Sequence, residues 1–134
     1  MPKTIVNPPS LPKPSGFSHG IVASGGRILF LAGQTGSGGD GNIAAPGDLV
    51  AQFEQAILNL KAVCEAAGGK LADVVKLNIF VRDRNRYLEL RKPLGQVFRR
   101  HFGGHYPTMA LFEVSGLFQE EALVELEGMA ALDF

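Results

Sequence analysis

The feature that most constrains this chain is a short segment, residues 27–32, that is apolar at almost every position. Alternate side chains of a strand point to opposite faces of its sheet, so such a strand needs cover on both faces. The chain of 134 residues offers two helical segments, which cover only one face of a sheet of about five or six strands. Large exposed apolar patches are rare on monomers. We therefore expect copies of the chain to associate and cover the second face.

The strands are predicted from apolar runs and from alternation between apolar and polar residues. Within residues 74–81, Val75 and Leu77 fall on one face and Val74 and Lys76 on the other. A glycine pair at positions 25 and 26 suits the turn of a hairpin between the first two strands. The predicted strands are residues 20–24, 27–32, 74–81, 106–114 and 122–131.

Two helices complete the predicted order, ββαβαββ, which describes an α/β chain of the α+β type with one sheet and both helices on one face. The first helix covers residues 48–67, with Asp48 as its N-cap and an apolar stripe at helical spacing. The second lies within residues 86–101. Because Pro93 disfavours regular helix before it, the firm part is expected from about residue 92 to residue 100.

Proline dominates the start of the chain. Because proline fixes φ and has no N–H to donate, this part is predicted to be extended rather than helical. The chain is accordingly divided into a proline-rich arm, residues 1–16, and a single domain, residues 17–134. The prolines of the arm that follow position 2 are Pro8, Pro9, Pro12 and Pro14.

Composition excludes several classes of protein. Thirteen basic and thirteen acidic side chains give a formal net charge of zero, which provides no basic footprint for nucleic acid. No apolar run approaches the roughly 20 residues that cross a bilayer, and residues 1–6 contain no signal-peptide core. The single cysteine, Cys64, excludes an internal disulfide and lies in the apolar stripe, so it is interpreted as a core residue. These features predict a cytoplasmic protein without nucleic-acid or membrane partners.

Motifs for metals, cofactors and serine nucleophiles are weak. His101 and His105 are four residues apart, but the intervening Gly103 and Gly104 disfavour a helix that would align the two rings. The glycine-rich residues 33–42 lack the spacing of a phosphate-binding loop, so a flexible turn is favoured. No serine stands in a nucleophile elbow. We therefore expect no metal ion and no cofactor.

Two sets of charged residues remain as candidates for ligand chemistry. Six arginines fall within residues 82–100; most are interpreted as a solvated helix face, although one could bind a carboxylate with its planar guanidinium. Glu125 and Glu127 alternate along the last strand, so both point to one face while Val124 and Leu126 point to the other. The two acids are either solvated or, in a partly buried cleft, able to position a water molecule.

Several segments, taken in order, resemble the Rid family, also called the YjgF family or reactive intermediate deaminases. The resemblance covers nearly the whole chain from about Phe17. The segments are residues 29–34 (LFLAGQ), 51–56 (AQFEQA) with 59–61 (NLK), 66–69 (AAGG), 74–83 (VVKLNIFVRD), and 106–109 (YPTM) through 124–127 (VELE).

This resemblance implies a chorismate-mutase-like fold and a homotrimer whose sheets form a central barrel with the helices outside. It also implies small-molecule clefts at the subunit interfaces. The best-known members of the family hydrolyse enamine and imine products of pyridoxal-phosphate enzymes, releasing ammonia and a keto acid without a metal or cofactor. Older labels for the family are translation inhibitor and endoribonuclease.

Only some of the family's site residues have a chemically similar counterpart in this chain. The family arginine that grips the substrate carboxylate is replaced by Met109, which makes no charge-assisted bond. The family glutamate that holds or activates water is similar to Glu127. The family tyrosine near the N-terminus corresponds to Phe17, and the small residue before Gly-Gln is Ala32. A polar residue before the second helix falls near Arg91, which is a candidate for a replacement cation.

Leu111 and Glu125 complete the predicted substrate-binding set. The leading interpretation is a hydrolase or deaminase that acts on a small imine or enamine, with Glu127 as the catalytic residue. The alternative is a small-molecule-binding trimer without catalysis, or a Rid relative with another hydrolytic activity. Met109 discriminates between the leading interpretation and the alternative, because it disfavours standard 2-imino-acid substrates but not less anionic ones. Ribonuclease or translation-inhibitor activity is less favoured, since a neutral chain grips RNA poorly.

Overall fold

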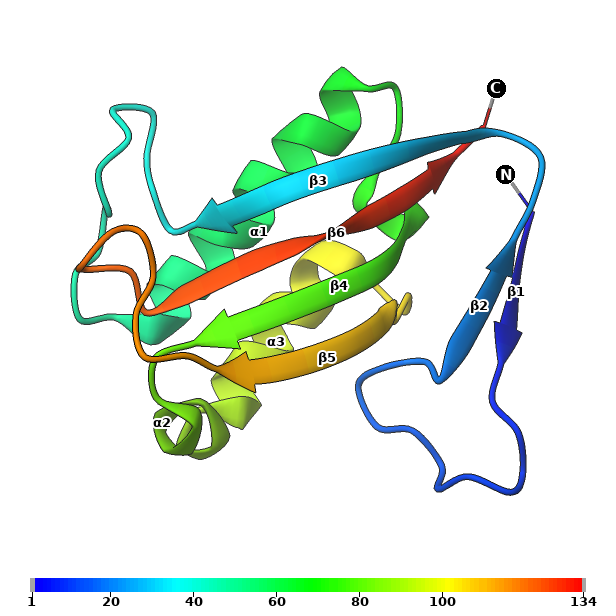
Figure 1. The fold of residues 1–134 in the computed structure, drawn as a ribbon, viewed down its shortest axis with the longest axis horizontal. Helices are drawn as coiled ribbons and strands as arrows, with labels where there is room; N and C mark the ends of the chain where they lie inside the picture. The colour runs from blue at the N-terminus through cyan, green and yellow to red at the C-terminus, as the bar shows by residue number, and fades with distance from the viewer. Residues whose placement is uncertain (1, 134) are drawn as a thin grey trace.

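A four-stranded sheet is the main layer of the computed structural model, which describes residues 2–133. Its strands, in spatial order, are β3 (Arg27–Thr35), β6 (Val124–Leu132), β4 (Val74–Val81) and β5 (Thr108–Glu113) (Figure 1). β4 and β5 are parallel, and the other neighbours are antiparallel. Met1 and Phe134, the outer ends of the predicted arm and domain, lie outside the described residues.

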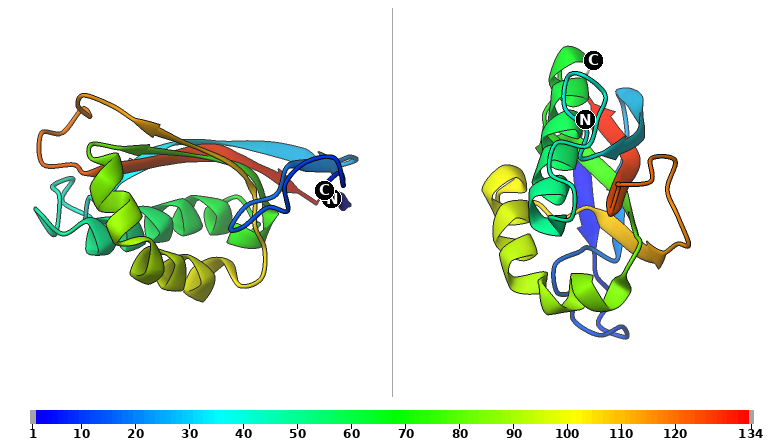
Figure 2. Two further views of the ribbon diagram at one scale, coloured as in Figure 1. Left: turned by 90° about the horizontal axis from the view of Figure 1, so that it is seen from below. Right: turned by 90° about the vertical axis from the view of Figure 1, so that its left-hand side faces the viewer.

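The helices α1 (Leu49–Ala66) and α3 (Arg91–Phe102) lie on the same face of this sheet, and the opposite face carries no helix (Figure 2). The predicted α+β fold is thus confirmed. A short helix, α2 (Arg84–Glu89), precedes α3, and Pro93 falls in the first turn of α3, where its missing N–H costs no helical hydrogen bond. None of the helices formed by residues 2–133 is long and apolar enough to cross a bilayer.

The core lies between α1, α3 and the covered face of the sheet. Asp48 begins α1 as predicted, since its carboxylate accepts a hydrogen bond from the Ala51 amide at 3.0 Å. The apolar stripe of α1 is buried, at a gain of about 1.5–3 kcal/mol for each large side chain. Its members are Leu49, Phe53, Ile57, Leu60 and Cys64.

The hairpin predicted between residues 20–24 and 27–32 is wrong. β2 (Gly20–Ala23) pairs with β1 (Lys3–Val6) in a separate two-stranded sheet, while β3 pairs only with β6. Gly25 and Gly26, with φ of 65° and 158°, form a corner that carries the chain from one sheet to the other. β1 lies within the predicted arm, so the observed order begins with one strand more than expected.

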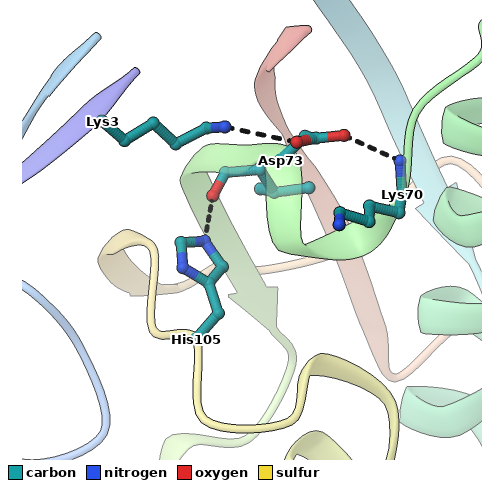
Figure 3. Close-up of polar contacts among 5 residues, drawn as sticks. Lys3, Lys70, Asp73 and His105 are labelled. Carbon is teal, nitrogen blue, oxygen red and sulfur yellow. Dashed lines mark hydrogen bonds and ion pairs between the residues drawn. The ribbon is translucent and has the colours of Figure 1, made fainter. Parts of the chain in front are cut away.

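Polar contacts fix this N-terminal hairpin to the end of the main domain (Figure 3). The Lys3 ammonium lies 3.2 Å from the Asp73 carboxylate, and both side chains are largely buried. Asp73, in the short helix η1 (Leu71–Asp73), also accepts a hydrogen bond from the Lys70 amide at 2.9 Å. Nearby, within the main domain, the ring of His105 bonds the Val74 carbonyl. Lys3 therefore joins the first strand of the hairpin to η1.

The alternation predicted for residues 74–81 fails at its first residue. The register with β6 shifts between Val74 and Lys76, so Val74 shares the buried face with Leu77. The bulge brings the Lys76 carbonyl against Gly128, where an added Cβ would collide with it. Glycine is required at position 128 by this close approach.

Gln52 connects α1 to the segment that leads into β6. Its side chain is fully buried. Its amide nitrogen donates to the Ala45 carbonyl at 2.9 Å and to the Glu121 carbonyl at 3.2 Å, and its oxygen accepts from the Leu123 amide at 2.8 Å. Gly36 packs directly on this residue, since a Cβ there would lie 2.7 Å from the Gln52 Cα.

We predict that Gln52→Ala lowers the free energy of unfolding by about 2–4 kcal/mol, because it leaves buried backbone groups without partners. Urea denaturation followed by circular dichroism measures the change. Gln96→Ala, at an exposed position on α3, is the control and should change stability by less than about 0.5 kcal/mol. Equal effects of the two substitutions would contradict the structural role of Gln52.

Burial raises the pKa of the Cys64 thiol to about 11, and the charges of Asp73 and Glu65 add to the shift. Since the thiolate is the reactive form, we expect an aromatic disulfide reagent at pH 8 to leave the native protein unmodified over minutes. The same reagent should label one thiol per chain once guanidinium unfolds the protein. Rapid labelling of the native protein would contradict the core assignment.

Candidate functional site

Two carboxylates lie on the face of the sheet that carries no helix. Val124 and Leu126 are fully buried under the helices, whereas Glu125 and Glu127 alternate with them and are half-buried on the opposite face. The Glu127 carboxylate accepts a hydrogen bond from the Asn78 side chain at 3.3 Å. A carboxylate held in this way can accept a proton from water and orient it.

Glu125 lies against a bulge in β3. The register between β3 and β6 shifts between Leu31 and Gln34, which places Ala32 and Gly33 in the bulge. A Cβ at Gly33 would collide with the Glu125 carboxylate, so glycine leaves the space that this acid occupies. Sequence reasoning selected Ala32 but missed Gly33; the Gly-Gln pair after the apolar strand was the available signal.

Three of the predicted substrate-binding residues meet at the outer edge of β5, the last strand of the main sheet. Phe17, Met109 and Leu111 line a cavity of about 210 Å³. The segment before β2 is fastened there, because the Ser18 amide donates to the Pro107 carbonyl at 3.0 Å. The Ser18 hydroxyl also donates to the Tyr106 carbonyl at 2.6 Å. Apart from Tyr87 the lining side chains are apolar, and none of them is charged.

Arg91 lines an adjoining cavity of about 360 Å³. The two cavities share Gly16 and Tyr87, which stand between them. Burial raises the pKa of the Tyr87 hydroxyl, so this group stays neutral between the cavities. Arg91 therefore lies beside the apolar cavity rather than within it.

The predicted site residues form two groups on opposite faces of one chain. Met109 pairs with Leu77, whose side chain is buried under the helices, while Glu127 pairs with Asn78 on the other face. The sheet separates the two groups. A single chain therefore does not bring its carboxylates to its own apolar cavity.

The carboxylate face is also apolar over much of its area. Phe30 and Ile28 on β3 are 74% and 64% exposed. Phe112 on β5 stacks on Phe80 of β4, with ring centroids 5.4 Å apart. Met129 on β6 is exposed between them in the strand order. This face has the composition of an interface rather than of a solvated surface.

Both histidines considered as metal ligands have other partners. The ring of His101 lies 2.7 Å from the Glu54 carboxylate, which also binds Arg100 at 2.6 Å. The hydrogen bond from His101 lowers the pKa of Glu54, and the charge of Arg100 adds to this effect. Within residues 2–133, no cluster of three or more His, Cys, Asp or Glu side chains could hold a metal ion.

Comparison with known proteins gives consistent matches. The family model described as Endoribonuclease L-PSP matches residues 10–132. A 2-iminobutanoate/2-iminopropanoate deaminase from Dermatophagoides farinae is 32% identical over 133 residues, which cover 98% of each chain.

Solved structures agree. The Rid-family protein YyfB from Yersinia pestis is 32% identical, with a TM-score of 0.87 over 98% of this chain and 100% of that one. RidA from Psychrobacter sp. is 31% identical, with a TM-score of 0.68 over 88% of this chain and 89% of that one. The family expected from the sequence is thus confirmed: this chain belongs to the endoribonuclease L-PSP family, which is also called the Rid or YjgF family.

Proposed function

We propose that this chain hydrolyses a small reactive imine or enamine and releases ammonia and a carbonyl compound. The observation that carries the proposal is the pair of half-buried carboxylates on the helix-free face, in a chain that matches an imine deaminase along almost its whole length. The formal net charge of zero gives ribonuclease activity little support.

The proposed reaction uses one water molecule and proton transfers through Glu127. Glu127 accepts a proton from a bound water, whose oxygen adds to the carbon of the C=N bond, and returns this proton to the nitrogen to give a carbinolamine. Glu127 then carries the hydroxyl proton of the carbinolamine to the nitrogen, so that the C–N bond breaks, ammonia leaves and a C=O bond forms. An enamine substrate first gains a proton on carbon and loses one from nitrogen, which gives the imine. Glu125, two residues away on the same face, is proposed to contact the substrate.

We further propose that three copies assemble with their helix-free faces toward one another. The apolar cover that Phe30 and Ile28 require supports this arrangement, as does the position of the two groups of site residues on opposite faces. In such an assembly, the carboxylates of one copy meet the Met109 cavity of its neighbour. The cleft between two copies then brings together the bound water, the Glu127 carboxylate and the apolar cavity lined by Met109.

Met109 sets this chain apart from a standard 2-imino-acid deaminase. Loss of a desolvated cation typically costs roughly 2–5 kcal/mol of affinity for its anionic partner. This favours substrates that are less anionic, or whose charge is bound elsewhere. It also supports a second candidate function, a trimer that binds a small molecule without hydrolysing it.

We predict that the protein accelerates keto-acid release only weakly when a serine dehydratase generates 2-iminopropanoate from serine, because Met109 provides no cation for the carboxylate, and that Glu127→Gln abolishes this acceleration. The release of pyruvate is followed with and without the protein. Glu89→Gln, at an exposed position on α2, is the matched control and should keep full activity.

Glu125→Gln distinguishes the two acids in the same assay. A smaller loss than that of Glu127→Gln agrees with a contact role for Glu125. A loss confined to Glu125→Gln would transfer the role in water activation to Glu125. No acceleration by the wild-type protein would remove this substrate and leave the binding function as the better account.

We predict a trimer for the wild-type protein and a monomer for Phe30→Asp, because a buried, unpaired carboxylate at an apolar contact is strongly unfavourable. Light scattering coupled to size-exclusion chromatography measures both masses. Leu58→Asp, on the solvent side of α1, is the control and should remain a trimer. A stable wild-type monomer in dilute solution would contradict the assembly.

A further inference from the structure

Arg91, Gly95 and Arg99 line one wall of the cavity beside the apolar pocket. They are spaced at four-residue intervals along α3, so they lie on the same side of that helix. The Cα atoms of Arg91 and Arg99 are separated by about 12 Å along the helix axis. The two long side chains can therefore extend toward each other and approach the same ligand. Gly95 lies midway between them.

The glycine leaves room for a guanidinium over the helix. A Cβ at Gly95 would meet one atom within 4 Å, the Nη1 of Arg99, at 3.3 Å. Side chains of a helix lean toward its N-terminus, so Arg99 reaches back over Gly95 in the direction of Arg91. A larger side chain at position 95 would compete with the guanidinium for this space, whereas a methyl group would shift it by only a few tenths of an ångström.

The charge of this cavity is unbalanced. No aspartate or glutamate lines it. Within residues 2–133, the guanidinium groups of Arg91 and Arg99 form no ion pair with a carboxylate. Arg100, the neighbour of Arg99 in sequence, binds Glu54 instead. Two cations without an acidic partner, beside a hydroxyl from Ser15, make a wall suited to a carboxylate.

We propose that this wall of α3 binds the carboxylate of the substrate, in place of the cation that Met109 does not provide. The inference rests on the proposed function and deepens it. The apolar part of the substrate occupies the neighbouring cavity lined by Phe17, Met109 and Leu111. The substrate class is therefore an imine that carries both a carboxylate and an apolar side group, such as a ring or a branched chain.

Isothermal titration calorimetry with 3-phenylpropanoate and 3-phenylpropanamide tests this inference without any catalysis. The two probes share the ring and differ in charge. Wild-type protein should bind the carboxylate more tightly than the amide. Arg91→Gln and Arg99→Gln should each weaken the carboxylate about 10- to 100-fold and leave the affinity for the amide unchanged.

Gly95→Leu provides a sharper test, because leucine favours the helix while its larger side chain would occupy the place of the Arg99 guanidinium, which lies 3.3 Å from a Cβ at this position. Carboxylate affinity should fall although the melting temperature is kept or raised. Arg84→Gln, which removes the same charge from α2 and lines neither cavity, should bind like the wild type.

Equal wild-type affinities for the two probes, or arginine variants that keep full carboxylate affinity, would overturn the α3 site. The predicted binding pattern without any acceleration of keto-acid release would refute the proposed function and leave the anion site standing. Acceleration that persists unchanged in both arginine variants, with unchanged binding, would overturn the anion site alone.

Discussion

The sidedness of the sheet governs the rest of this structure. Helices α1 and α3 cover one face, so the strand residues on that face are apolar and inert. Every residue that alternates with them must face the other way. Glu125, Glu127 and Asn78 occupy that other face because Val124, Leu126 and Leu77 are committed to the core. The candidate site residues are therefore placed by the same alternation that builds the interior.

Buried polar side chains then set how α1 meets the sheet. Gln52 holds the segment before β6, while the Asn59 amide donates to the Thr35 and Ser37 carbonyls at the end of β3. Hydrophobic contacts alone would tolerate sliding between a helix and a sheet, whereas these bonds fix one position. These bonds position β3 and β6, and the bulge at Ala32 and Gly33 lies where β3 pairs with β6. Gly33 leaves the room there that the Glu125 side chain occupies.

Much of the fold could be predicted from signals between residues that are close in sequence. The Asp48 cap and the apolar stripe predicted α1, and alternation predicted which way Glu125 and Glu127 point. Features that depend on distant partners were missed. The glycines at 25 and 26 suit a corner as well as a hairpin turn, and only the pairing of β1 with β2 distinguishes them. The bulge at Val74 depends on a close contact with Gly128, and no residue near Val74 in the sequence indicates this contact. The separation of Met109 from Glu127 likewise depends on strand pairing, which a list of site residues does not contain.

The opposed placement of Met109 and Glu127 also shapes how the protein tolerates damage. In the proposed trimer, every copy serves two different clefts, lending its acids to one and its pocket to another. A chain impaired in both halves would spoil two of the three clefts of any assembly that it enters. The fraction of inactive clefts would thus be larger than the fraction of defective chains. A mixture of wild-type and defective chains would then lose more activity than expected from the proportion of defective chains alone.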